Sequence, residues 1–224
     1  MREQINYDDV ITVPPCGIAG PSGDIQADER IDRVLIPETC LQARIRALAA
    51  QICRDYATTQ YLYLVVLLKG AFVFAADLGR EICRLGGPHL KYDFIKAVTY
   101  GMAIKNSTER KREVAIQLKP TRLQGQDVLL VDDIVDQAFT MSKARHVLAL
   151  ENVKSLRTCA LLYKVLEDPT PELRKLKTAL PLDYVGFRVT DRWVAGYGID
   201  AAEEFRHLPF IVAVDERHYK EDTC

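Results

Sequence analysis

The sequence of 224 residues lacks the features that mark several functional classes. Its 30 Lys and Arg residues nearly balance its 31 Asp and Glu residues, and a formal net charge of −1 is not typical of a nucleic-acid-binding protein. No apolar run approaches the roughly 18 residues of a membrane-spanning helix, and no secretory signal pattern opens the chain. We therefore expect a soluble, cytoplasmic protein that binds neither nucleic acid nor membrane.

Cysteine and histidine are sparse, with six of the first and four of the second. Neither set has the spacing of a zinc site, and no C-x-x-C pair occurs. A chain of this length can bury enough apolar surface to fold without disulfides. We therefore expect free thiols in a reducing compartment and no zinc.

Three common enzyme signatures are also missing. The chain has no G-x-x-x-x-G-K-[ST] loop, no G-x-G-x-x-G after a strand, and no informative spacing of Ser, His and Asp or of Cys and His. These absences argue against a P-loop nucleotidase, a dinucleotide-binding domain and a nucleophilic hydrolase.

The apolar segments that are present predict an α/β protein. Residues 61–68 form a continuous apolar run, which is typical of a strand covered on both faces in a parallel sheet. Strands alternate with helices over about residues 60–165, so we expect a central, mostly parallel sheet flanked by helices. The predicted strands are 34–36, 61–68, 90–98, 114–118, 128–131, 155–162, 184–189, 193–199 and 210–214, and the predicted helices are 37–56, 72–85 and 140–150.

The two ends of the chain differ from this core. Residues 1–30 are rich in Pro and Gly, which predicts an irregular extension. Residues 31–224 are expected to form one domain, in which short strands of 165–224 combine with 31–37 into a small accessory lobe.

An acidic segment follows the buried strand at 128–131. Asp132, Asp133 and Asp136 lie within five positions, and an amphipathic helix begins near Thr140. Ligands bind at the carboxyl ends of parallel strands, and a helix N-terminus offers free amides to a phosphate. The segment therefore indicates either a site for a phosphorylated ligand with a polyol or Mg²⁺, or a solvated acidic turn.

Basic residues are also expected at the carboxyl ends of the parallel strands. Lys69 and Lys164 each end a predicted strand, where they would flank the acidic segment and help to hold an anion. The basic segment 101–112 fits a mobile surface loop, a loop that closes over an anionic ligand, or both.

The residues then resemble a known family. Residues 128–141, Val-Leu-Leu-Val-Asp-Asp-Ile-Val-Asp-Gln-Ala-Phe-Thr-Met, are similar to the phosphoribosyl-pyrophosphate motif of type I phosphoribosyltransferases. Four further stretches, in the family's order, resemble its hypoxanthine-guanine (6-oxopurine) branch. They are residues 68–78, 99–101, 163–164, and 191–200 with 205–206.

The resemblance implies purine salvage. The expected reaction joins 5-phosphoribosyl 1-pyrophosphate to a 6-oxopurine (hypoxanthine, guanine or xanthine) and releases a nucleoside 5′-monophosphate and pyrophosphate, with Mg²⁺ as cofactor and a homodimer or homotetramer as the assembly. The reaction develops an oxocarbenium-like ribose and a departing pyrophosphate, charges that fixed carboxylates and cations stabilise.

The resemblance also implies a role for each matching residue. The expected roles are Asp136 as general acid/base at purine N7; Asp132, Asp133, Gln137, Ala138, Phe139 and Thr140 in phosphoribose binding; Lys69, Gly70 (after a cis Leu68-Lys69 peptide) and Arg206 in pyrophosphate binding; Ile134, Lys164, Trp193, Val194 and Asp200 in purine binding; Thr99 and Tyr100 on the closing loop; and Asp132, Asp133 and Asp200 in holding Mg²⁺.

The chain departs from the family pattern in the acidic segment. Asp132 replaces a Glu, and Gln137-Ala138-Phe139 replaces Thr-Gly-Lys in the phosphate loop. A cradle of main-chain amides survives the loss of Lys, but Ala138 adopts a positive φ less readily than Gly. The altered loop therefore leaves two alternatives, an active enzyme with weakened substrate affinity or a catalytically weak, nucleotide-binding regulator.

Overall fold

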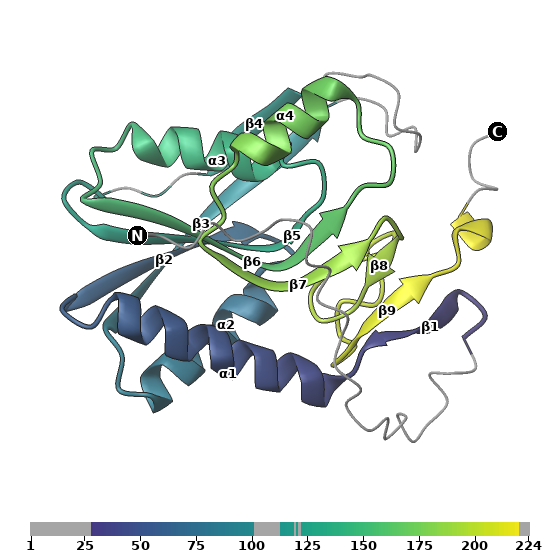
Figure 1. Ribbon diagram of the computed structural model, residues 1–224, viewed down its shortest axis with the longest axis horizontal. Helices are drawn as coiled ribbons and strands as arrows, with labels where there is room; N and C mark the ends of the chain where they lie inside the picture. Colours follow the sequence, from purple (N-terminus) through teal and green to yellow (C-terminus); the bar gives the residue numbers. More distant parts are fainter. Residues whose placement is uncertain (1–27, 101–112, 119, 121, 220–224) are drawn as a thin grey trace.

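The computed structural model describes residues 28–100, 113–118, 120 and 122–219. A six-stranded sheet of order β4-β3-β2-β5-β6-β7 lies at its centre (Figure 1). Every neighbouring pair is parallel except β3 and β4, so the expected mostly parallel α/β fold is confirmed. The strands are β2 (Tyr61–Leu68), β3 (His89–Tyr100), β4 (Glu113–Leu118), β5 (Asp127–Val135), β6 (Ser155–Val165) and β7 (Tyr184–Thr190).

Strand β2 explains why the sheet needs cover on both sides. Leu64 and Val66 belong to the core cluster beneath one face, whereas Val65 and Leu67 belong to the cluster on the other. Successive side chains of a strand point to opposite faces, so a continuous apolar run must be covered twice. Helices α1 (Glu38–Asp55) and α2 (Phe72–Arg84) cover one face, and α3 (Phe139–Ala149) and α4 (Pro171–Ala179) cover the other (Figure 1).

Helix α4 was not predicted. It lies between the predicted strands 155–162 and 184–189, and Thr170 caps it by accepting a hydrogen bond of 3.3 Å from the Leu173 amide. Pro171 occupies the first turn, where its missing N–H costs nothing.

The small lobe contains a second, antiparallel sheet of order β1-β9-β8. It joins β1 (Ile31–Ile36) to β9 (Ile211–Val214) and β8 (Val194–Ala195), so both ends of the described chain contribute. The predicted strand at 193–199 is therefore wrong beyond Ala195. Gly196 and Gly198 have φ of +102° and +97° and turn the chain away instead.

Two other expectations can be compared with the structure. Cys40 is disulfide-bonded, so the expectation that every cysteine is a free thiol is wrong. Cys53, Cys83 and Cys159 are free.

In the described part of the chain, no helix has the length and apolar character needed to cross a membrane. The expected extension up to residue 27 and the basic segment 101–112 lie outside the described residues.

Candidate active site

The acidic pair belongs to a strand rather than to a turn. Strand β5 continues to Val135, and Asp132 pairs with Ala160 of β6, so the expectation of a turn beginning at Asp132 is corrected. Asp136 is the first residue beyond the strand. The three carboxylates therefore lie at the carboxyl end of a central strand, with β2 on one side and β6 on the other.

Burial dominates the electrostatics of the pair. Asp132 is only 6% exposed, and burial followed by repulsion from Asp133 raises its pKa well above the ordinary value. Burial also raises the pKa of Asp133, although hydrogen bonds from Asp132 and the Ile134 amide oppose the shift. The two groups titrate together, and a cation or a hydroxyl-bearing ligand at this end of β5 would stabilise their charged form.

The loop after the acids surrounds a cavity of about 80 Å³ at the start of α3. Ala138 occupies the N-cap with φ of +68°, and its side chain makes no capping hydrogen bond. The first turn of α3 carries no acidic residue. Its amides and its positive dipole end are therefore suited to an anion such as a phosphate. The cavity is lined by Asp132, Ile134, Val135, Asp136, Gln137, Ala138, Phe139, Thr140 and Met141.

A cluster of charges connects the ends of β5 and β6. Lys164, only 9% exposed, donates to Asp136 Oδ2 at 3.4 Å and lies 3.9 Å from Asp191 Oδ1. Lys177 reaches the same place from α4, where its Nζ donates to the main-chain oxygens of Asp136 and Lys164.

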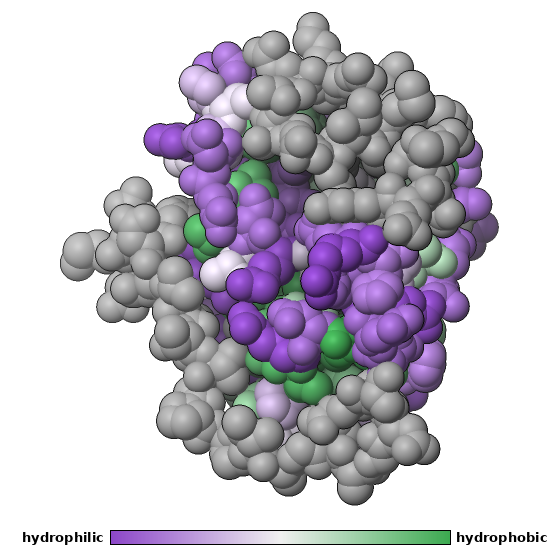
Figure 2. Space-filling model, turned by 90° about the vertical axis from the view of Figure 1, so that its right-hand side faces the viewer, coloured by the Kyte–Doolittle hydropathy of each residue, from purple (hydrophilic) through white to green (hydrophobic). Residues whose placement is uncertain are grey.

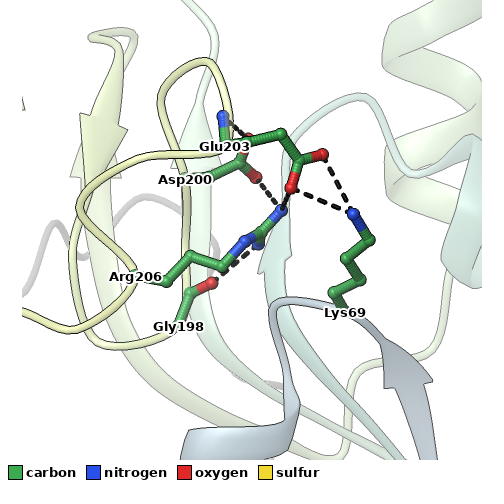
Figure 3. A network of polar contacts seen from close by, with 5 residues as sticks. All are labelled: Lys69, Gly198, Asp200, Glu203 and Arg206. Carbon is green, nitrogen blue, oxygen red and sulfur yellow. Dashed lines mark hydrogen bonds and ion pairs between the residues drawn. The ribbon is translucent and has the colours of Figure 1, made fainter.

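A second network faces the loop after β2 (Figure 3). Glu203 accepts hydrogen bonds from Lys69 Nζ at 3.0 and 3.1 Å and forms an ion pair of 3.1 Å with Arg206. Arg206 also binds the Asp200 carboxylate at 2.8 Å and donates to the Gly198 carbonyl at 2.9 Å. Two cations from separate parts of the fold thus share one carboxylate.

Close backbone packing brings this network to the acidic pair. The Leu68-Lys69 peptide is cis, as the resemblance implied. A Cβ on Gly70 would lie 1.7 Å from Asp133 Oδ2, and one on Gly198 would lie 2.2 Å from the Gly70 oxygen. The absence of side chains at both glycines therefore lets the lobe, the loop after β2 and the end of β5 meet.

The face around these strand ends is polar. Figure 2 views the molecule from the side of the small lobe, and hydrophilic residues gather in the middle of that face beside a hydrophobic patch.

The comparisons with known proteins agree with this geometry. The family model described as "Phosphoribosyl transferase domain" matches residues 39–202. The hypoxanthine phosphoribosyltransferase of Salmonella typhimurium is 41% identical over 187 residues, covering 82% of this chain and 97% of the relative. The chain belongs to the hypoxanthine-guanine phosphoribosyltransferase family.

Solved structures of this family superpose well. A hypoxanthine-guanine phosphoribosyltransferase from Bacillus anthracis has a TM-score of 0.68 at 35% identity and covers 83% of this chain and 98% of its own. The ternary substrates complex of a Trypanosoma cruzi hypoxanthine phosphoribosyltransferase has a TM-score of 0.72 at 30% identity, with coverages of 85% and 99%. The family resemblance found in the sequence is thus confirmed.

The structure of this phosphoribosyltransferase brings some expected site residues together and separates others. Half-buried Ile134 packs on the core beneath the main sheet, whereas Trp193 packs on the core of the lobe, where its ring lies 4.6 Å from that of Tyr219. Val194 is buried in β8. Thr99 and Tyr100 end β3, and their side chains lie outside the described part.

The expected metal ligands do not form one cluster. Among the described residues, no three His, Cys, Asp or Glu side chains are grouped so that they could hold a metal ion. Asp200 instead binds Arg206 and accepts a hydrogen bond of 3.0 Å from the Glu203 amide.

Two residues of the site were missed in the sequence. Glu203 and Lys177 are single charged residues without a motif, so no pattern distinguished them from surface charges. The helix start at Thr170-Pro171-Glu172 was a usable signal for α4 and hence for the region of Lys177.

Proposed function

We propose that this chain transfers 5-phosphoribosyl from phosphoribosyl pyrophosphate to N9 of hypoxanthine or guanine, with xanthine as a third candidate. The observation that carries the proposal is the carboxyl end of β5. There, the buried Asp132 and the half-buried Asp133 precede a helix N-terminus with open amides. Gly70, next to the cation Lys69, packs against the second acid. A sugar phosphate with an anionic leaving group matches this order of acids, amides and cations.

The proposed roles are those that the family resemblance implies for the matching residues. Asp132 and Asp133 bind the ribose hydroxyls, and the amides of residues 137–140 bind the 5′-phosphate. Lys69, Gly70 and Arg206 bind pyrophosphate.

The purine is proposed to bind between the sheet and the lobe. Ile134 would pack on one face of the purine ring, and Trp193 would stack on the other face. The purine would thus lie between the core of the sheet and the core of the lobe, and Lys164 would donate to its O6. Asp136, held 3.4 Å from Lys164, would exchange the proton at N7. Main-chain atoms of Val194 and Asp200 would contact the other edge of the ring.

Mg²⁺ is proposed to bind near Asp132, Asp133 and Asp200, whose oxygen ligands suit a hard cation. The raised pKa values of the buried pair fit this role, because a cation nearby would offset their repulsion. When bound, Mg²⁺ would neutralise charge on the pyrophosphate. Rearrangement of the Asp200–Arg206 ion pair would accompany its binding.

Two wider proposals concern assembly and location. A homodimer or homotetramer is supported by large apolar side chains left exposed on α2 and β3, namely Phe72, Tyr92 and Phe94. Sedimentation of the purified protein tests this proposal. A cytoplasmic location is supported by the free Cys53, Cys83 and Cys159, while the disulfide of Cys40 counts against it.

The decisive test mixes the protein with Mg²⁺, phosphoribosyl pyrophosphate and one of hypoxanthine, guanine or xanthine, and follows nucleotide formation. Turnover of hypoxanthine or guanine is the expected result. Nucleotide binding without turnover would instead favour the regulatory alternative. In the active protein, Asp136→Asn is expected to lower turnover far more than it weakens nucleotide binding.

A further inference from the structure

Lys177 occupies an unusual position on α4. It lies four residues after the buried Leu173, on the inward face of the helix, and is only 6% exposed. A lysine is seldom buried to this extent unless its ammonium has partners. Here Nζ donates to the main-chain oxygens of Asp136 and of Lys164, the latter at 2.8 Å, and lies 4.2 Å from the centre of the Tyr163 ring.

The two carbonyls lie where the pairing of β5 and β6 ends. The register of the two strands reaches Val135 opposite Tyr163. Asp136 and Lys164 come one position later, where β5 has ended. The ammonium of Lys177 therefore bridges two main-chain carbonyls just beyond the last paired residues of β5 and β6.

We propose that Lys177 is a positioning residue, which fixes the spacing between the Asp136 carboxylate and the Lys164 ammonium at the purine. This inference rests on the proposed function. Neither carbonyl belongs to the side-chain groups that would touch the purine, so Lys177 acts through the backbone that carries them. Small displacements of reacting groups lower turnover strongly, while substrate binding is affected less.

The charges around Lys177 are consistent with this role. Burial lowers its pKa to about 8, and the nearby Asp136 and Asp191 oppose the shift, whereas Lys164 and Arg188 add to it. The group is thus mostly an ammonium at neutral pH, and it loses its charge beside Asp136 as the pH rises past 8.

The test compares Lys177→Met with Lys175→Met, an exposed lysine on the same helix. Met fills the buried position and removes the donor. We expect kcat to fall about tenfold to hundredfold in Lys177→Met, with the KM for phosphoribosyl pyrophosphate changed by less than about threefold. Lys177→Arg should recover part of the loss, and Lys175→Met should match the wild type.

The ratio of wild-type to Lys177→Met kcat should be largest below pH 8 and shrink above it. An unchanged kcat in Lys177→Met would overturn the proposal.

A second measurement does not depend on turnover. Amide hydrogen exchange around residues 136 and 164 should be faster in Lys177→Met than in Lys175→Met, with the rest of the sheet unchanged. Equal exchange in the two variants would refute the bridge. If the wild type converts no purine, the proposed function fails, and hydrogen exchange still decides whether Lys177 holds the strand ends.

Discussion

Two buried aspartates at opposite ends of β5 have opposite electrostatic surroundings. Burial raises the pKa of Asp127, but this effect is outweighed by hydrogen bonds from Lys154 at 2.7 Å and Ser155 at 2.6 Å, so its pKa is lowered overall. The pKa of Asp132 is raised by burial and by Asp133. At neutral pH the charge of Asp127 therefore stabilises the folded state, and the charge of Asp132 destabilises it.

Asp132→Asn is accordingly expected to raise the free energy of unfolding of the metal-free protein by on the order of 1 kcal/mol at neutral pH, while turnover is lost. The folded state binds a proton at Asp132 more tightly than the unfolded state does. The wild type therefore loses stability as the pH rises through the interval between the ordinary and the raised pKa, and the variant does not. Urea denaturation at acid and neutral pH measures the difference.

The matched control is Asp127→Asn. It removes the charge from a paired carboxylate in the same strand and should lower the free energy of unfolding by about 1–3 kcal/mol at neutral pH. If Asp132→Asn were destabilising to a similar extent, the buried pair would not be a source of repulsion.

The charge of Glu203 is expected to oppose the binding of pyrophosphate. Its carboxylate lies between Lys69 and Arg206, where pyrophosphate is proposed to bind. Glu203→Gln should therefore tighten the binding of pyrophosphate by about twofold to fivefold, a modest change because exposed ion pairs are weak. Calorimetric titration measures it, with Glu204→Gln as the control because Glu204 pairs with Arg30 instead. Weaker binding to Glu203→Gln would mean that Glu203 helps to hold the cations in place.

At the scale of elements, the central sheet was predictable because its strands are rich in apolar residues, with continuous apolar runs in β2 and in the first half of β5. The boundaries were less predictable where single interactions decide them. Strand β5 extends through Asp132 because β6 pairs with it, and β8 ends at Ala195 because Gly196 turns the chain. Neither effect appears in a local hydrophobic pattern. The altered phosphate loop, by contrast, was recognisable from the sequence, and Ala138 does adopt the positive φ that was expected to be unfavourable for it.

Ala138→Gly tests the consequence for α3. Glycine removes the cost of a left-handed φ of +68°, so the free energy of unfolding should rise by up to about 1 kcal/mol and the KM for phosphoribosyl pyrophosphate should fall. Ala144→Gly, within the same helix, should instead destabilise the protein by about 1 kcal/mol or more. Thermal unfolding and initial rates measure both effects. A higher KM in Ala138→Gly would indicate that the methyl group holds the loop in its binding conformation.

At the scale of the whole molecule, the site forms where the small lobe meets the carboxyl ends of the central strands of the main sheet. Lys69 follows β2, and Arg206 comes from the lobe, yet both bind the same carboxylate (Figure 3). The contact that sets their separation is the packing of Gly198 on the carbonyl of Gly70. The proposed pyrophosphate site therefore depends on how closely two parts of the fold approach each other, which no single motif encodes.

Gly198→Ala and Gly125→Ala separate this approach from backbone strain. Both glycines have positive φ, but a Cβ at Gly198 would lie 2.2 Å from the Gly70 oxygen, whereas one at Gly125 would meet nothing within 4 Å. Gly125→Ala should lower the free energy of unfolding by about 1 kcal/mol and leave the KM for phosphoribosyl pyrophosphate unchanged. Gly198→Ala should lower the free energy of unfolding by about 2–4 kcal/mol and raise the KM for phosphoribosyl pyrophosphate about tenfold or more, because the lobe must shift away from the loop after β2. Steady-state kinetics and urea denaturation of the two variants measure these effects, and an equal KM in both would mean that the cations reach pyrophosphate independently of the Gly198 contact.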